Sequence, residues 1–176
     1  MRVLPSIILF ADIRDSSEIA GTLSIEEYDF LLNEFQVLMR AAIEQVLSSH
    51  FRPGIPWPGE ISIRGDEAYL VLFAGPDGVS ADAGLRAVME IAFAMKRKWL
   101  LSQVNRQRIL QGKMIQDIGI GMHMGEIALG PHPGRGTGHT AEGWAINLAK
   151  KLETASREGQ YSKIIVSSSV YHRVRH

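Results

Sequence analysis

The sequence Ile7-Ile8-Leu9-Phe10-Ala11-Asp12-Ile13 is an apolar run that carries an aspartate close to its end. A second carboxylate, Asp66, lies in the turn Arg64-Gly65-Asp66-Glu67, just before the apolar run at 68–73. If these two runs are neighbouring strands, Asp12 and Asp66 meet at one end of a sheet. Two hard oxygen ligands so placed suit Mg²⁺ and a bound phosphate chain. Taken alone, the pair is more typical of solvated strand ends beside a glycine turn.

The composition is that of an ordinary globular domain. The chain has 176 residues, 45% of them hydrophobic and 22% charged, which is most simply one domain spanning 1–176. The formal net charge is zero, which gives no sign of nucleic-acid binding or of attachment to anionic lipid. The absence of cysteine excludes disulfides, thiol catalysis and cysteine-ligated zinc. Neither a membrane span nor a signal-peptide pattern is present, so we expect a cytoplasmic domain, whole or cut from a longer chain.

Hydrophobic periodicity predicts an alternation of strands and helices. The expected strands are 3–13, 60–64, 67–74, one or two within 115–127, and 163–167. Three helices are expected. The first spans 24–49 and begins with the capping box Ser24-Ile25-Glu26-Glu27. The second follows the turn at 75–78 and continues toward Leu110, and the third spans 142–156. Residues 168–174 read as a terminal helical turn, and 51–59 and 130–139 as loops.

The order of these elements predicts the fold class. Strand, helix, two strands, helix and strand fit the α+β, ferredoxin-like βαββαβ core. In that core an antiparallel sheet carries the helices on one face. A third helix and a last strand follow the core.

Four segments, in order, resemble the class III adenylate/guanylate cyclase catalytic domain, and the match covers nearly the whole chain. They are Leu9-Phe10-Ala11-Asp12-Ile13-Arg14, Gly65-Asp66-Glu67, residues 118–126 (IGIGMHMGE) and residues 143–153 (GWAINLAKKLE). The resemblance implies attack of a ribose 3′-hydroxyl on the α-phosphate, with pyrophosphate expelled. It also implies that Asp12 and Asp66 bind two Mg²⁺ or Mn²⁺ ions, with the Ile13 carbonyl completing one coordination shell.

The resemblance assigns catalytic roles on the third helix. Asn147 would orient the ribose, and Lys151, four residues later, stands where the family has an arginine that contacts the α-phosphate. Lysine keeps the charge but loses the planar fork. Lys150 is also basic and competes for this role. The alternative for all three residues is a solvated helix face.

The resemblance also assigns substrate contacts. Ser62 stands where adenine selection normally uses a lysine, Thr140 is its partner position, and Arg64, on the same side of the strand as Ser62, is a candidate for the missing role. Arg64 is equally a turn residue that pairs with a neighbouring glutamate.

The segment after Asp12 departs from the family pattern. The family has a glycine, an aromatic or small residue and a threonine here, whose backbone amides hold the phosphates; this chain has Asp15, Ser16 and Ser17. The serines still donate hydrogen bonds, while the charge of Asp15 opposes a triphosphate. Alternatively, Asp15 or Ser16 caps a short helix.

The end of the chain departs as well. The family continues past the strand at 163–167 with a C-terminal hairpin, which is missing here, so we expect a trimmed or a shortened domain.

These observations predict an adenylate cyclase that converts ATP to cyclic AMP and pyrophosphate as a head-to-tail homodimer. GTP is the alternative substrate, and neither nucleic acid nor membrane is expected as a partner. The alternative function is a catalytically weak or inactive nucleotide-binding and dimerisation module, which Ser62, Lys151 and Asp15 favour. A diguanylate cyclase lacks support, because its Gly-Gly-Asp/Glu-Glu-Phe turn is absent.

Overall fold

The computed structural model describes residues 2–51, 57–75, 79–131, 139–159 and 161–175. The strands in this part of the chain are β1 (Arg2–Ile13), β2 (Gly59–Arg64), β3 (Glu67–Phe73), β4 (Ile118–Pro131), β5 (His139–Glu142) and β6 (Ile164–Val166). The helices are α1 (Ser16–Ala20), α2 (Ile25–His50), α3 (Ala81–Leu100), α4 (Gln103–Leu110), α5 (Trp144–Ala155) and α6 (Ser168–Val174), with a short 3-10 turn at Ser156–Glu158.

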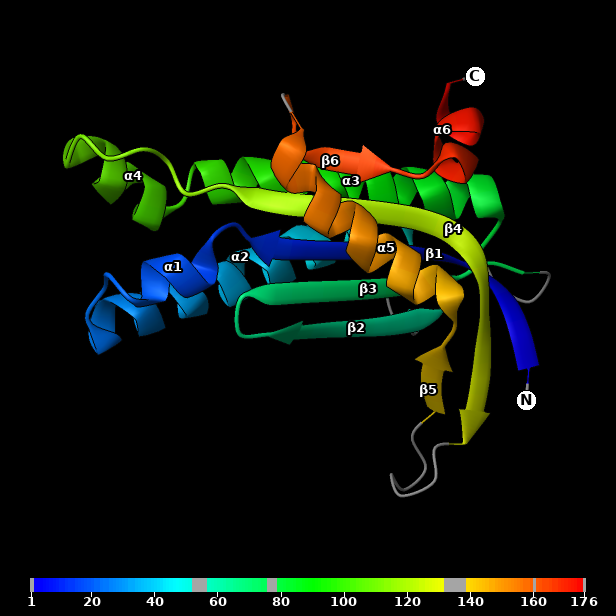
Figure 1. Cartoon of the computed structure of the whole chain (residues 1–176). Coiled ribbons are helices and arrows are strands. Elements are labelled where there is room, and N and C mark those ends of the chain that lie inside the picture. The colour runs from blue at the N-terminus through cyan, green and yellow to red at the C-terminus, as the bar shows by residue number, and fades with distance from the viewer. Residues whose placement is uncertain (1, 52–56, 76–78, 132–138, 160, 176) are drawn as a thin grey trace.

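The described strands form one sheet in the order β2-β3-β1-β4-β5, and β6 lies beside β4. All pairings along the main path are antiparallel, while β6 runs parallel to β4. The first six major elements follow the βαββαβ order, so the predicted α+β, ferredoxin-like core is confirmed. Figure 1 shows α2 and α3 behind the sheet and α5 in front of it.

Strand β1 is apolar at nearly every position because both faces of the sheet are covered at its centre. Ile7, Leu9 and Ala11 pack into the core beneath α2 and α3. Ile8 and Phe10 point the other way, into a smaller cluster with Ala145 and Ala149 of α5. Side chains of β1 point alternately to the two faces of the sheet, and those on each face pack into a separate apolar cluster.

Serine caps set where the helices begin. Ser24 and Glu27 form the predicted capping box at the start of α2. The second long helix does not continue to Leu110 as expected: α3 stops at Leu100, and Ser102 caps a new helix, α4, by accepting a hydrogen bond from the Asn105 amide. The periodicity missed this break because Trp99 and Val104 are both buried and keep the apolar pattern running.

Other boundaries differ by a few residues. The region 115–127 holds one strand, β4, which begins at Ile118 and continues to Pro131. Residues 139–142, expected at a loop and a helix start, form β5 against the end of β4. The remainder of the predicted loop, 132–138, and the middle of the loop at 51–59 lie outside the described residues.

Two glycines let α5 rest directly on the sheet. A Cβ atom at Gly121 would lie 2.1 Å from the Glu153 nitrogen and 2.4 Å from the Ala149 oxygen, both backbone atoms of α5. A Cβ at Gly119 would lie 2.2 Å from the Ser156 hydroxyl. Gly121 is therefore required by close approach of the α5 backbone, and Gly119 by close approach of the Ser156 side chain.

None of the described helices has the length and apolar character needed to cross a membrane.

Candidate functional site

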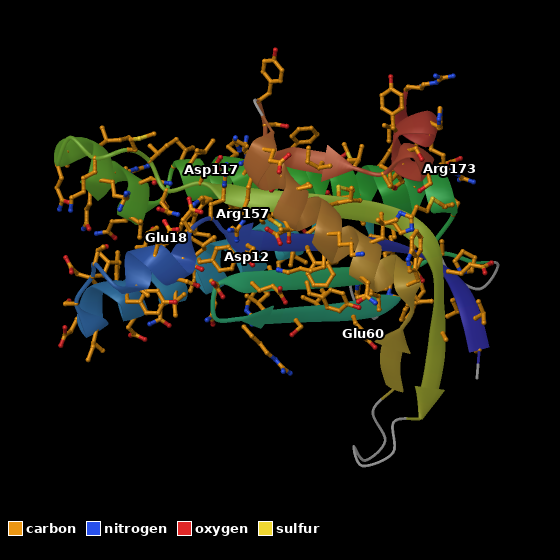
Figure 2. All side chains as sticks on the ribbon, viewed as in Figure 1. Asp12, Glu18, Glu60, Asp117, Arg157 and Arg173 are labelled. Carbon is orange, nitrogen blue, oxygen red and sulfur yellow. The ribbon has the colours of Figure 1, made fainter. Side chains whose placement is uncertain are left out.

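Asp12 and Asp66 lie at the same end of two neighbouring strands. The β1–β3 register pairs Asp12 with Glu67, and the amide of Ile13 donates a 3.1 Å hydrogen bond to the carbonyl oxygen of Asp66. The Asp12 side chain is 17% exposed and close enough to Asp66 for the two charges to interact. Figure 2 shows Asp12 on β1, next to α5. The tertiary structure therefore brings the two predicted metal ligands together with the Ile13 main chain.

The segment after β1 supports Asp66. Ser16 is buried at the start of α1, and its hydroxyl donates a hydrogen bond to the Asp66 carboxylate. Ser17, the next residue, is exposed. Asp15 precedes the helix with a φ of 56° and makes no side-chain cap, so the capping alternative for Asp15 is wrong. Its carboxylate lies 3.9 Å from the Arg157 guanidinium, which partly offsets the charge.

Lys150 places its ammonium at the centre of the acidic residues. Its Nζ lies 2.9 Å from the Asp12 carboxylate, 2.7 Å from that of Glu67 and 3.0 Å from that of Glu153. The ammonium also lies 5.6 Å from the centre of the Phe10 ring, within cation–π range. For Lys150, the solvated-face alternative is therefore wrong.

One ammonium does not neutralise this cluster. Burial raises the pKa of Asp12 from 3.8 to about 6; Lys150 opposes the rise, whereas Asp66 and Glu153 add to it. Burial favours the neutral amine of Lys150, but its hydrogen bonds to Glu67, Asp12 and Glu153 outweigh that effect and raise its pKa. The excess of negative over positive charge favours the binding of a cation of higher charge at this cluster.

The oxygen donors fit a divalent cation that is shared with a substrate. No three or more His, Asp or Glu side chains in the described part of the chain form a ready-made metal cage. Mg²⁺ commonly uses only one or two carboxylates and takes its other ligands from water and phosphate. Asp12, Asp66 and the Ile13 carbonyl match that donor set, because all of them are hard oxygen ligands.

A cavity of about 320 Å³ opens beside the acidic cluster. Its described lining consists of Phe10, Glu60, Ser62, Arg64, Glu67, Tyr69 and Ile146. Ser62 and Arg64 thus open into the same hollow, as their spacing on β2 predicts. Burial raises the pKa of Tyr69, and the charge of Glu60 adds to the rise, so the phenol stays protonated.

The predicted catalytic residues of α5 point away from this cluster. Asn147 and Lys151 are exposed, as is Trp144, whose side chain is 70% exposed. The opposite face of α5 is buried through Ala145, Ala149 and Glu153. One helix therefore presents Lys150 to its own Asp12 and turns Asn147 and Lys151 outward.

Thr140 belongs to β5, where its backbone pairs with Gly130. Its side chain lies outside the part of the chain whose side chains are described.

The sequence interpretation missed Glu67 and Glu153 as members of the site. Two signals were available. Glu67 faces Asp12 once the hairpin register is known, and Lys150 and Glu153 are three residues apart on a helix, which places them on one side.

Comparison with known proteins gives a consistent family. A family model described as the adenylate and guanylate cyclase catalytic domain matches residues 5–176. A search of curated proteins found no match.

Solved structures share the fold at low sequence identity. The adenylyl cyclase CyaB from P. aeruginosa is similar with a TM-score of 0.74 and 22% identity, over 99% of this chain and 82% of that one. The guanylyl cyclase Cya2 gives a TM-score of 0.68 and 24% identity, over 98% and 79%. The guanylate cyclase domain of RhGC from Catenaria anguillulae, in complex with GTP, gives 0.68 and 15%, over 99% and 85%.

Proposed function

This chain belongs to the adenylate and guanylate cyclase catalytic domain family, and from that premise we propose that it converts ATP to 3′,5′-cyclic AMP and pyrophosphate as a homodimer. The observation that carries the proposal is the meeting of Asp12 and Asp66 at one sheet end, beside a cavity of about 320 Å³. In the proposed reaction the ribose 3′-hydroxyl gives its proton to solvent and its oxygen forms a bond to the α-phosphorus. The bond from the α-phosphorus to the oxygen that bridges it to the β-phosphorus breaks, and pyrophosphate leaves with that oxygen.

Asp12, Asp66 and the Ile13 carbonyl would hold two divalent ions, Mg²⁺ or Mn²⁺. When bound, such ions activate the 3′-hydroxyl and neutralise charge on the triphosphate. Ser16 acts on this site through Asp66, because its hydroxyl already donates to that carboxylate and fixes its orientation. The exposed hydroxyl of Ser17 remains available to a phosphate oxygen.

The orientation of α5 supports the assembly from two copies. Asn147 and Lys151 face outward, so they do not serve the Asp12 of their own chain. In a head-to-tail dimer, Asn147 would orient the ribose bound by the other copy. Lys151 would place positive charge on the α-phosphate there. Trp144, three residues before Asn147 and strongly exposed, adds apolar area to the same helix face.

The adenine base would lie in the cavity beside β2. Ser62 and Arg64 line it, and Thr140 completes the base contacts by resemblance. A serine hydroxyl donates or accepts a hydrogen bond with less energy than a charged lysine. Discrimination between ATP and GTP is therefore expected to be modest.

A second function is a nucleotide-binding and dimerisation module with little or no turnover. The observation that favours it is the ion pair of Lys150 with Asp12, which occupies a proposed metal ligand. Lys151 stands where the family has an arginine, and this also favours the module, because lysine lacks the bidentate fork of arginine.

The test is product formation by the purified chain with ATP or GTP and Mn²⁺, measured by chromatography and mass spectrometry. We expect cyclic AMP to exceed cyclic GMP. Asp12→Asn and Asp66→Asn should each lower the rate at least about a hundredfold. Asp29→Asn is the control, because Asp29 is an exposed residue of α2 whose carboxylate accepts a hydrogen bond from Asn33.

Other outcomes separate the two functions. If neither cyclic nucleotide forms while nucleotide still binds, the chain is the module and the enzyme proposal fails. If cyclic GMP predominates, the cyclase proposal stands with the other substrate. Lys151→Arg should raise the rate, and an unchanged rate removes Lys151 from the α-phosphate.

A further inference from the structure

The ammonium of Lys150 gathers carboxylates from three separate elements. Asp12 comes from β1, Glu67 from β3 and Glu153 from α5 itself, and each carboxylate lies 3.0 Å or less from Nζ. The same ammonium lies 5.6 Å from the centre of the Phe10 ring. Such a contact set is a built ion-pair cluster rather than a surface lysine with a chance neighbour.

This cluster includes the carboxylate that the proposed metal site needs. The Oδ2 atom of Asp12 accepts a hydrogen bond from Lys150, so that oxygen is already occupied by a cation. A divalent ion on the same carboxylate would lie a few ångströms from the ammonium, where like charges repel strongly in a partly buried site. The two cations therefore exclude each other at Asp12.

We propose that Lys150 is a resident counter-ion of the metal site: its ammonium holds Asp12 in the metal-free protein, and a divalent cation binds only when that ammonium leaves. The inference rests on the proposed function for the identity of the metal ligands. The inference adds the Lys150 ammonium as a competitor of the metal ion for the Asp12 carboxylate. Divalent-ion affinity is then set partly by a residue that ligates no metal.

The surroundings give the ammonium a place to go. The Lys150 side chain is 37% exposed, so one side of it is open to solvent. Two of its other neighbours, Glu67 and Phe10, line the cavity beside β2. A rotation toward the cavity releases Asp12 and keeps Glu67, and it carries a positive charge to where the nucleotide is proposed to bind.

The neighbouring lysine does not share this behaviour. Lys151 is exposed on the outward face of α5. The difference follows from the rotation of α5 about its axis. Ala149 is buried against the sheet, and Lys150, the next residue, lies at the border of that buried face, where its ammonium reaches Asp12.

Mn²⁺ binding without nucleotide tests the proposal. The dissociation constant is measured by titration calorimetry and by the electron paramagnetic resonance of free Mn²⁺, for the wild type and for Lys150→Met. Methionine keeps an unbranched apolar stem and removes the charge. We expect Lys150→Met to bind Mn²⁺ about tenfold more tightly. Lys113→Met removes the same charge from an exposed residue after α4 and should leave the dissociation constant unchanged.

The wild-type chain provides a direct readout of displacement. Lys150 should resist acetylation by limiting acetic anhydride in the metal-free protein, because its ammonium is held by carboxylates. Saturating Mn²⁺ should raise its labelling several-fold relative to Lys113, measured by peptide mass spectrometry. This measurement needs no variant and decides the question if Lys150→Met does not fold.

The outcomes distinguish this inference from the proposed function. Equal Mn²⁺ affinity in the wild type and Lys150→Met, with binding lost in Asp12→Asn, overturns the counter-ion role and leaves the metal site standing. Unchanged acetylation of Lys150 on Mn²⁺ binding overturns it as well. Absence of Mn²⁺ binding in the wild type and in Lys150→Met overturns both proposals.

Discussion

The pKa of Asp12 is set by competing effects of its surroundings. Burial favours its protonated form, and the ammonium of Lys150 favours its ionised form, with burial the larger effect. The carboxylates of Asp66 and Glu153 add to burial. A buried carboxylate destabilises the folded state when it is ionised and lacks sufficient positive charge nearby. Groups with a pKa shifted in this way are common at ligand-binding sites.

A pH-dependent stability follows from the pKa of about 6 at Asp12. The folded state binds the Asp12 proton more tightly than the unfolded chain does. Protonation of Asp12 therefore adds to the free energy of unfolding at low pH. This contribution is lost as the pH rises through about 6. Between pH 4.5 and 7.5, the metal-free wild type should lose about 2 kcal/mol more free energy of unfolding than Asp12→Asn does.

Urea denaturation in the presence of a chelator measures this difference. His123, whose pKa burial lowers, is present in both proteins, so its contribution cancels. Parallel pH profiles of the two proteins would show that Asp12 titrates near its ordinary pKa.

At the scale of elements, the contact between α5 and β4 positions the site. Gly119 and Gly121 leave no side chain between the strand and the helix backbone, and Ala145 and Ala149 form the helix side of the contact. This contact sets the rotation of α5. The rotation in turn decides which of its polar residues reach Asp12.

Gly121→Ala should lower the free energy of unfolding by at least about 2 kcal/mol, because the added Cβ would overlap backbone atoms of α5 that cannot rotate away. The measurement is urea denaturation. Gly75→Ala is the matched control: a Cβ there meets nothing within 4 Å, and its effect should stay within about 0.5 kcal/mol. Equal stabilities would mean that α5 shifts without cost and does not fix the site.

The elements also show what periodicity predicts and what it misses. β1, α2 and the β2–β3 hairpin were predicted within a residue or two, because apolar alternation, a capping box and a glycine turn are local signals. The break at Ser102 and the strand β5 were missed. The start of α4 after Ser102 is supported by Glu34 of α2, whose carboxylate accepts hydrogen bonds from the Gln103 and Val104 amides, and β5 depends on its pairing with the end of β4.

For the whole molecule, the outward face of α5 leaves the proposed site incomplete in one copy. Asp12 and Asp66 lie on the inner side of this helix, and Asn147 and Lys151 on the outer side. In the proposed homodimer, a two-fold axis would bring Asp12 and Asp66 of each copy to Asn147 and Lys151 of the other, because in a two-fold interface residue i of one copy meets residue j of its partner and the reverse.

Complementation tests this arrangement. Asp12→Asn and Asn147→Ala should each be nearly inactive alone, while an equimolar mixture should regain about a quarter of the wild-type rate, since half of the random dimers hold one intact site. The rate of cyclic nucleotide formation is the readout. A mixture of Asp12→Asn with Asp66→Asn is the matched control and should stay inactive, because both changes damage the same half. Failure of the first mixture to regain activity would contradict a site shared between copies.

The sequence by itself determined the order of the core elements, the fold class and the position of each aspartate at the end of an apolar run. These properties follow from apolar periodicity, turn chemistry and motif spacing, which act over neighbouring residues. The pairing of β1 with β3 in the tertiary structure brings the two aspartates together. Only the tertiary structure decided that Lys150, and not Lys151, faces Asp12, and that Glu67 and Glu153 join it. The physical reason is the packing of α5 on Gly121. Adjacent residues of a helix are about 100° apart around its axis, so the rotation that distant contacts set decides which of the two lysines forms the partly buried ion pair.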